Sequence, residues 1–229
     1  MSNITIQELA KMIDCAAVSP ITTELDVREL VALAKKYKFI SIGTFSCFMP
    51  LLKELLGDQK EILIGCGVGF PSGYTRTYIK IIEARDALAD GCREIDMVAN
   101  IGYLKSGRFD DTLDDIKAVV DVLDGIPLKV IIEVAYLTND EIKRACDIVV
   151  KSGAAFIKTG TGWTSYPITL DRVHLIKSQV GDAIGIKASG GIKDLHTLLA
   201  LKDAGASRFG IGKNSAIKIM EECEMLQGK

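Results

Sequence analysis

Five charged side chains interrupt segments of the chain that are otherwise apolar. They are Lys158 at the end of AFIK, Lys187 at the end of AIGIK, Asp96 within REIDMV, Glu133 at the end of KVIIE and Asp14 within KMID. A lysine on a strand that is covered on both faces costs several kcal/mol if it stays charged and unpaired. The presence of these residues therefore calls for a chemical or a structural reason.

Two lysines that approach each other offer a chemical reason. Two ammonium groups in one place cannot both hold their protons, so one loses its proton near neutral pH and becomes a nucleophile. A neutral amine adds to an aldehyde or ketone and, after loss of water, leaves an iminium ion. That cation withdraws electrons from the neighbouring carbon–carbon bond, so the predicted chemistry is class I aldolase cleavage, which needs no metal or cofactor. The structural alternative is that each lysine only pairs with a carboxylate in the core.

The residues that follow each lysine assign the roles. Lys158 precedes TGTG, where small residues leave the amine accessible and the hydroxyls of Thr159 and Thr161 can bind substrate oxygens. We therefore expect Lys158 to be the nucleophile and Lys187 its charge partner. Asp96 is expected to move protons during formation of the carbinolamine and protonation of the enamine, by way of a water.

The segment after Lys187 suggests an anion site. It reads ASGGI, and a helix is expected to begin just beyond it, at Asp194. The backbone N–H groups of Gly190 and Gly191, together with that helix N-terminus, can receive an oxyanion or a phosphate.

Apolar, strand-like runs alternate regularly with helix-like linkers along the chain, and these segments must position the charged residues. Most of the apolar runs are nearly continuous in hydrophobicity, as expected for strands of a parallel sheet that is covered on both faces. The predicted strands are 11–16, 39–45, 62–70, 93–100, 128–135, 155–162, 183–191 and 207–212. Helical periodicity or helix-start and helix-stop residues mark the linkers, most clearly at 26–38, 75–91, 138–153, 169–181 and 193–205.

Eight strands separated by helices predict an α/β protein. We expect a single (β/α)8 TIM barrel over residues 1–229, with a short N-terminal helix, because no G-x-G-x-x-G follows the first strand. In such a barrel the chemistry lies at the carboxyl ends of the strands. The charged residues fall late in their strands, in agreement with that placement.

Composition limits the partners. The 229 residues carry 28 Lys plus Arg against 30 Asp plus Glu, a net charge of −2. We therefore expect neither nucleic acid nor a membrane surface as a partner. No signal peptide or membrane span is evident, so a cytoplasmic location is expected, with the six cysteines as free thiols. Scattered cysteines and two histidines make a metal site improbable.

Several motifs together resemble the deoxyribose-phosphate aldolase family over about residues 9–220. They are VGFPSG at 68–73, EIDMVANIG at 94–102, KVIIE at 129–133, FIKTGTG at 156–162 and IKASGGIK at 186–193. The resemblance implies that the Schiff-base lysine is Lys158, the second lysine Lys187, the proton-relay aspartate Asp96 and the first-strand aspartate Asp14. It implies reversible cleavage of 2-deoxyribose 5-phosphate into acetaldehyde and glyceraldehyde 3-phosphate. By analogy with such barrels, a homodimer is expected.

Three positions depart from the family pattern. Ala16 replaces a threonine in the first strand, Gly160 replaces a serine, and Gly212 replaces a serine expected to bind phosphate in the last strand, beside Gly210. We expect Lys213 or Asn214, or Ser215 beside them, to replace the lost phosphate contact at the start of the final helix. The departures leave open a different sugar or aldehyde substrate, or a barrel that binds sugar phosphate without catalysis.

Three further residues are open to interpretation. Trp163 either lines the pocket or covers the barrel rim or an oligomer contact. Cys47 is expected near the site as a pocket-lining thiol without a nucleophilic role. His174 lies between apolar residues of a predicted helix and is not expected to be catalytic.

Overall fold

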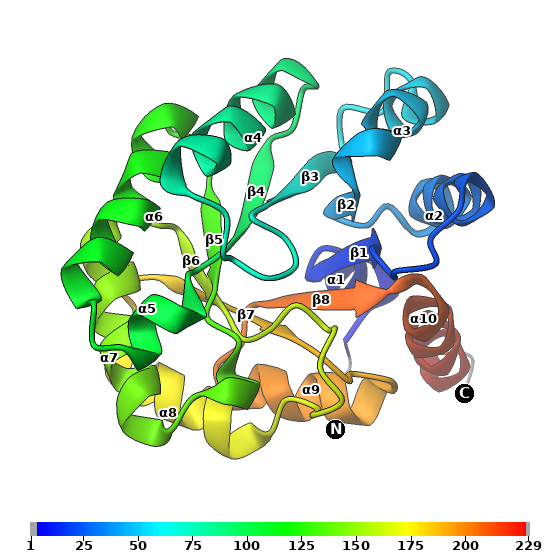
Figure 1. Ribbon diagram of the computed structural model, residues 1–229. Helices are drawn as coiled ribbons and strands as arrows, with labels where there is room; N and C mark the ends of the chain where they lie inside the picture. The colour runs from blue at the N-terminus through cyan, green and yellow to red at the C-terminus, as the bar shows by residue number, and fades with distance from the viewer. Residues whose placement is uncertain (1–3, 228–229) are drawn as a thin grey trace.

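The chain forms the predicted closed barrel. The computed structural model describes residues 4–227, and its eight strands are parallel, each paired with the next and the last with the first (Figure 1). The strands are β1 Ile13–Ala17, β2 Ser41–Thr44, β3 Leu63–Val68, β4 Glu94–Val98, β5 Leu128–Ile131, β6 Phe156–Lys158, β7 Gly185–Ser189 and β8 Arg208–Gly212. The fold class expected from the alternating pattern is confirmed.

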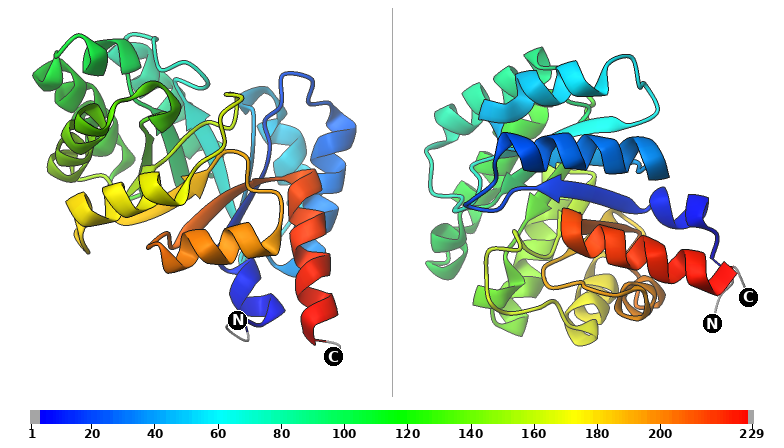
Figure 2. Two further views of the ribbon diagram at one scale, coloured as in Figure 1. Left: turned by 90° about the horizontal axis from the view of Figure 1, so that it is seen from below. Right: turned by 90° about the vertical axis from the view of Figure 1, so that its right-hand side faces the viewer.

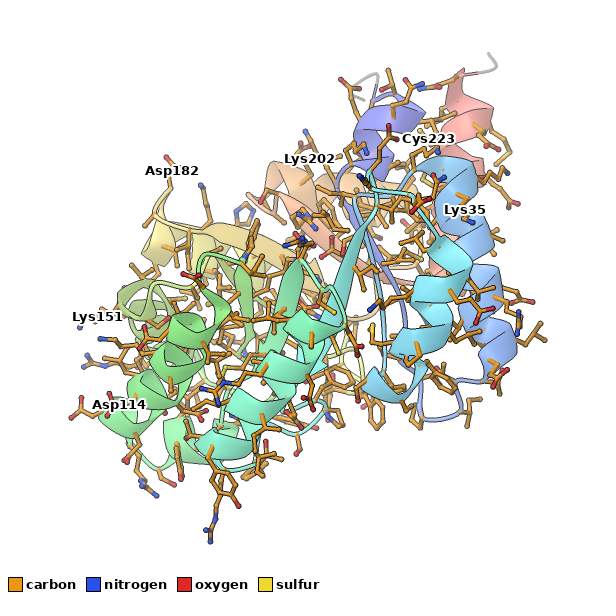
Figure 3. The ribbon with its side chains drawn as sticks, turned by 90° about the horizontal axis from the view of Figure 1, so that it is seen from above. Lys35, Asp114, Lys151, Asp182, Lys202 and Cys223 are labelled. Atoms are coloured by element: carbon orange, nitrogen blue, oxygen red, sulfur yellow. The ribbon has the colours of Figure 1, made fainter. Side chains whose placement is uncertain are left out.

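A helix follows every strand and lies on the outside of the barrel. The α-helices are α1 Ile6–Ala10, α2 Glu24–Tyr37, α3 Met49–Leu56, α4 Thr77–Ala89, α5 Ile101–Lys105, α6 Phe109–Leu123, α7 Asn139–Ser152, α8 Leu170–Val180, α9 Leu195–Asp203 and α10 Lys213–Gln227. Short 3-10 helices lie at Ser46–Phe48 and Val134–Tyr136. The predicted short N-terminal helix is α1, which precedes β1. Charged side chains such as Asp114 on α6, Lys151 on α7 and Asp182 in the turn after α8 point outward (Figure 3).

Local signals in the sequence explain where α7 begins and ends. The Thr138 hydroxyl accepts a hydrogen bond from the Glu141 backbone, and the Glu141 carboxylate accepts one from the Thr138 backbone at 2.7 Å. Gly153 ends the helix at φ 82°, a left-handed conformation that favours glycine. The helix expected over 138–153 from its start and stop residues is confirmed.

The two faces of the barrel strands differ in chemistry. Alternate residues of each strand point outward, where aliphatic side chains pack under the helices. Those fully buried there include Ile42, Ile95, Val130, Ile157 and Phe209. The inward positions hold mostly charged, small and glycine residues, with exceptions such as Ile131 and Phe156, although barrels of this type usually fill them with branched aliphatic side chains. The hydrophobic core therefore lies between the strands and the helices.

Helix α1 and the end of α10 meet at the amino-terminal end of the barrel. Gln227 of α10 donates a hydrogen bond from Nε2 to the Ile4 carbonyl at 3.0 Å, and Figure 2 shows α1 and the last turn of α10 on the same side of the molecule. This contact lies at the end of the barrel opposite to the carboxyl ends of the strands. Within residues 4–227, no helix has the length and apolar character needed to cross a bilayer.

Candidate active site

A cavity of about 980 Å³ opens at the carboxyl ends of the strands. Every strand of the barrel contributes to its wall, and the contributors include Asp14, Ser41, Gly65, Asp96, Lys129, Lys158, Lys187 and Gly210. The barrel thus positions side chains that are distant in sequence around one space.

The predicted catalytic residues meet in this cavity. Lys158 Nζ lies 3.0 Å from Asp96 Oδ2, and Lys187 Nζ lies 2.8 Å from the same oxygen. Parallel pairing of β6 with β7 places the two lysines side by side in register. The other carboxylate oxygen, Asp96 Oδ1, is buried and has no hydrogen-bond partner among the described residues. The carboxylate therefore keeps one buried acceptor without a partner, and the exposed part of its side chain lines the cavity.

The two lysines have opposite pKa shifts. Burial is the main cause that lowers the pKa of Lys158 to about 8; the Asp96 carboxylate opposes the shift, and the positive charge of Lys187 adds to it. Burial also acts to lower the pKa of Lys187, but the carboxylates of Asp14 and Asp96 raise it above its usual value. Lys187 therefore stays an ammonium ion, whereas a sizeable fraction of Lys158 is neutral near pH 8. Burial, rather than the charge repulsion expected from the sequence, is the larger cause of this shift.

Asp96 remains ionised between the two lysines. Burial would raise its pKa, but the positive charges of Lys158 and Lys187 hold the pKa well below the usual range. The carboxylate is therefore an acceptor throughout the neutral range. It can receive protons from water or substrate but holds none in its resting state.

A second layer of buried charges lies beneath this pair. Lys129 Nζ lies 2.9 Å from Asp14 Oδ2 and 2.6 Å from Glu94 Oε2, and Arg208 binds both carboxylates as well. Asp14 also contacts Lys187, at 2.6 Å. Both oxygens of Asp14 are thus engaged by cations, so its role in the site is to hold Lys187 charged and in place. A contact between Asp14 and substrate stays a prediction.

Three residues of this layer were missed in the sequence. Glu94 and Arg208 stand at the starts of their strands, where a charge is typical of a residue at the surface. Lys129 is second in its strand and lies on the inward face, opposite in register to Asp96. A signal in the sequence exists for Glu94, which stands two residues before Asp96 on the same strand and so shares its inward face; Arg208 and Lys129 have no other polar residue on the inward face of their strands.

The loop after β7 provides open backbone donors. Gly190 and Gly191 line the cavity and adopt φ of 106° and 73°, a region that favours glycine. A Cβ on Gly191 would lie 2.6 Å from Pro167 Cβ, so a side chain is excluded there as well. Lys193 also lines the cavity, and no carboxylate of the described residues forms an ion pair with it. The predicted anion site therefore gains a cation that the sequence analysis did not assign.

The end of β8 and the start of α10 form the neighbouring wall. Gly210, Gly212 and Asn214 line the cavity, and a Cβ on Gly212 would have no atom within 4 Å. Lys213, in contrast, is bound by Asp26 at 2.9 Å and by Glu29, both on α2. The expectation that Lys213 replaces a phosphate contact is therefore not supported, because its charge is already neutralised.

The two threonines after Lys158 also have structural partners. Thr159 is fully buried outside the cavity wall, where its hydroxyl donates to the Ser189 carbonyl and accepts from the Ser189 N–H, both at 2.8 Å. The prediction that its hydroxyl binds substrate is therefore wrong; it joins β6 to β7. Thr161 does line the cavity, but its hydroxyl donates to Glu133 Oε2 at 2.5 Å.

Glu133 explains one departure from the family pattern. Its carboxylate is fixed by the Thr161 hydroxyl and by the Thr161 N–H at 3.1 Å. A Cβ on Gly160 would lie 2.6 Å from Glu133 Oε1. Glycine at position 160 therefore makes room for the buried carboxylate.

An aromatic cluster forms one rim of the cavity. The Trp163 ring packs edge to face against Phe45, with ring centroids 6.4 Å apart, and against Phe70 at 5.8 Å. Trp163 Nε1 donates a hydrogen bond of 2.7 Å to the Val18 carbonyl, so the loop after β6 is tied to the segment after β1. Figure 2 shows this yellow-green loop approaching the blue segment. Trp163 thus both lines the pocket and covers its rim.

The remaining predictions concern thiols, His174 and metals. All six cysteines are free; five are buried, whereas Cys47 is exposed and outside the cavity wall, so the pocket-lining role is wrong. His174 is exposed on α8, away from the site. Among the described residues, no group of three or more His, Cys, Asp or Glu side chains is arranged to hold a metal ion.

A (β/α)8 barrel with an ammonium–carboxylate–amine cluster at its carboxyl end defines an enzyme of the aldolase class. The family model "DeoC/LacD family aldolase" matches residues 11–217. The chain belongs to this family, and the enzyme is a carbon–carbon lyase.

Curated relatives and solved structures agree with this assignment. The chain is 42% identical over 227 residues to a deoxyribose-phosphate aldolase of Rhizobium meliloti (99% of this chain, 92% of the relative). It is 40% identical over 224 residues to one of Klebsiella pneumoniae (97% and 90%). The structure titled "QR15, an Aldolase" has a TM-score of 0.88 at 34% identity, covering 98% of this chain and 97% of that one.

A further structural relative bears on assembly. The enzyme from Aeropyrum pernix, described as having a unique tetrameric structure, has a TM-score of 0.85 at 27% identity, with coverage of 97% of this chain and 93% of that one. The expected homodimer of this chain and its cytoplasmic location stay predictions.

Proposed function

We propose that the enzyme cleaves 2-deoxyribose 5-phosphate reversibly into acetaldehyde and glyceraldehyde 3-phosphate through a Schiff base on Lys158. The observation that carries this proposal is the buried Lys158 amine, with its pKa lowered to about 8, 3.0 Å from a carboxylate that it shares with the protonated Lys187. The names of the relatives support the substrate.

Formation of the Schiff base uses the two different states of the lysines. The neutral Lys158 amine attacks C1 of the open-chain sugar, and the carbonyl oxygen takes up a proton to give a carbinolamine. Loss of its hydroxyl as water leaves the iminium ion. Lys187 stabilises negative charge that develops on the oxygen, and the Asp96 carboxylate, which lines the cavity, accepts a hydrogen bond from the water that moves the protons.

Cleavage then follows from the positive charge on nitrogen. A proton leaves the C3 hydroxyl, its oxygen forms a carbonyl, and the C2–C3 bonding electrons move to C2 to give the enamine. The ionised Asp96 carboxylate accepts the proton through a water. Protonation of the enamine at C2 and hydrolysis of the iminium ion release acetaldehyde and restore Lys158.

The phosphate of the substrate is assigned to the wall formed by the loops after β7 and β8. The backbone N–H groups of Gly190 and Gly191 lie beside Lys193 and the start of α10, where the helix dipole also favours an anion. Gly212 leaves this wall open, since nothing would contact a Cβ there. A phosphate at this wall places the other end of the sugar toward Lys158.

Reductive trapping tests the proposal. The protein is incubated with acetaldehyde, reduced with borohydride and mapped by mass spectrometry; one added ethyl group on Lys158 is expected. Lys158→Ala should abolish both the label and turnover, whereas Lys151→Ala, which changes an exposed lysine on α7, should change neither. An active Lys158→Ala variant that still takes the label at the site would contradict the assignment.

Gly212 favours a second candidate, the same chemistry on a sugar or aldehyde without phosphate. Cleavage of 2-deoxyribose 5-phosphate and of free 2-deoxyribose should be compared. Equal kcat/KM for the two sugars would support this candidate, and a large advantage for the phosphorylated sugar would exclude it. A barrel that only binds sugar phosphate would bind the substrate without any trapped adduct.

A further inference from the structure

The charges of the site occupy only part of the barrel interior. They come from β4 to β8 and from Asp14, whereas the other inward positions of the first three strands are small. These small residues all line the cavity: Ala16, Ser41, Gly43, Gly65 and Gly67. The mechanism proposed above uses none of them.

Gly65 has no backbone reason to be glycine. It is not among the glycines with positive φ, and it lies in the middle of β3. A Cβ built there would lie 3.5 Å from Ser41 Oγ and 3.6 Å from the Glu94 carbonyl, which are ordinary contacts. Glycine weakens a strand and often marks a place where a ligand comes close to the backbone. The space at Gly65 is therefore available to a ligand rather than needed by the protein.

The neighbouring glycines differ in this respect. A Cβ on Gly43 would lie 3.1 Å from the Gly65 carbonyl, a tight contact, and a Cβ on Gly67 would lie 2.8 Å from Phe70 Cβ. Gly43 pairs with Gly65 in register, so the two open positions form one patch of bare backbone. A side chain at position 65 would therefore enter the cavity without displacing neighbouring protein atoms.

The glycine patch lies across the barrel from the reactive lysine. In a closed barrel of eight strands in sequence order, β2 is opposite β6 and β3 is opposite β7. Lys158 stands on β6 and Lys187 on β7, so a carbon bound to Lys158 Nζ projects toward the patch. The phosphate wall, formed by the loops after β7 and β8, is on a different side. The patch therefore faces the aldehyde end of the substrate.

The surroundings favour an uncharged occupant. The aromatic rings of Phe45, Phe70 and Trp163 form the rim above the patch. The deep cations Lys129 and Arg208 are fully engaged by Asp14 and Glu94, which leaves no free charge to attract an ion. Bare backbone and ring faces suit an alkyl group.

We propose that Gly43 and Gly65, under the aromatic rim, form a subsite for an alkyl substituent on the aldehyde that is bound to Lys158. The enzyme then activates aldehydes longer than acetaldehyde, such as propanal and butanal, as the nucleophilic partner of the aldol reaction. This inference rests on the Schiff-base function proposed above. In the step concerned, Lys158 and the aldehyde form an iminium ion with loss of water, the α-carbon loses a proton to give the enamine, and a solvent proton restores the iminium ion.

Exchange of the α-proton in D₂O measures this step directly. Rates are followed by NMR for acetaldehyde, propanal and butanal with the wild-type enzyme, Gly65→Ala, Gly65→Val and the control Ile64→Val. Ile64 precedes Gly65 on the same strand, is absent from the cavity wall and packs against the hydrophobic core. Thermal unfolding of each variant shows whether it is folded, and Gly65→Ala serves if the valine variant is not.

The expected result is a change in selectivity. The wild-type enzyme should exchange butanal with a kcat/KM within about tenfold of that for acetaldehyde. Gly65→Val should lower the value for butanal at least about tenfold and that for acetaldehyde less than about threefold, the range in which a hydrophobic pocket discriminates chain length. Ile64→Val should leave the ratio unchanged.

Two kinds of failure are distinguishable. If no aldehyde is exchanged or trapped on Lys158, the Schiff-base function itself fails. If acetaldehyde is trapped and exchanged but butanal is excluded from the wild-type enzyme, or if Gly65→Ala and Gly65→Val keep the wild-type ratio, the subsite is overturned while the function stands.

Discussion

The rate of Schiff-base formation should follow the ionisation of a single buried amine. With a pKa of about 8, roughly one-tenth of Lys158 is neutral at pH 7, about 300 times the neutral fraction of a lysine with the usual value of 10.5. The rate with acetaldehyde should therefore rise about tenfold from pH 7 to a plateau above pH 9. The assay uses short incubation at each pH, a borohydride quench at one common pH, and mass spectrometry of the adduct.

Variants at position 187 test the electrostatic part of this argument. Lys187→Met removes a positive charge that lowers the pKa of Lys158, so the midpoint should move above 8 and the rate at pH 7 should fall. Lys187→Arg keeps the charge but changes its geometry, so the midpoint should stay near 8 while kcat falls strongly. A wild-type midpoint near 10.5, or a downward shift in Lys187→Met, would refute the reasoning.

Three further predictions follow from the contacts around the site. Asp14→Asn should cost about 3–5 kcal/mol of unfolding free energy at pH 7 because buried cations lose their partner. In urea titrations the difference in unfolding free energy between wild type and Asp14→Asn should shrink as the pH falls below 3.8, the ordinary pKa of an aspartate. The pKa of Asp14 is lowered in the folded protein, so its carboxylate stabilises the fold above pH 3.8 and loses this effect as falling pH protonates it. Gly160→Ser should destabilise by about 1–3 kcal/mol in thermal unfolding because its Cβ meets Glu133. Lys193→Ala should raise KM for the phosphorylated sugar more than Lys213→Ala, because Lys213 is already paired; equal effects would contradict this.

The fold could be predicted because one pattern recurs along the chain. Continuous apolar strands, helix caps and glycine stops each depend on neighbouring residues and so are visible locally. The ends of the strands were less accurate: the run predicted at 155–162 contains only Phe156–Lys158 as strand. Thr159 leaves the strand to bind the Ser189 backbone, a partner 30 residues away that no local pattern reveals.

The cluster of candidate catalytic residues could be anticipated for a related reason. Lys158, Lys187 and Asp96 are charges in strands that should be apolar, and such exceptions are visible in the sequence. The role of Lys213 could not be judged, because its partner Asp26 is 187 residues away and is brought to it only by the closure of the barrel. Long-range pairing of this kind decides which charged groups are free for a ligand.

The opposite chemistry of the two strand faces separates two tasks that most proteins perform with one core. Aliphatic residues such as Ile95, Ile157 and Phe209 hold the strands to the helices, and the side chains on the inner face are not needed for that adhesion. Substitutions on the inner face of the barrel can therefore accumulate with limited loss of stability, as long as each buried charge keeps a partner of opposite charge. A lineage with this arrangement can explore new reactants while its scaffold stays the same.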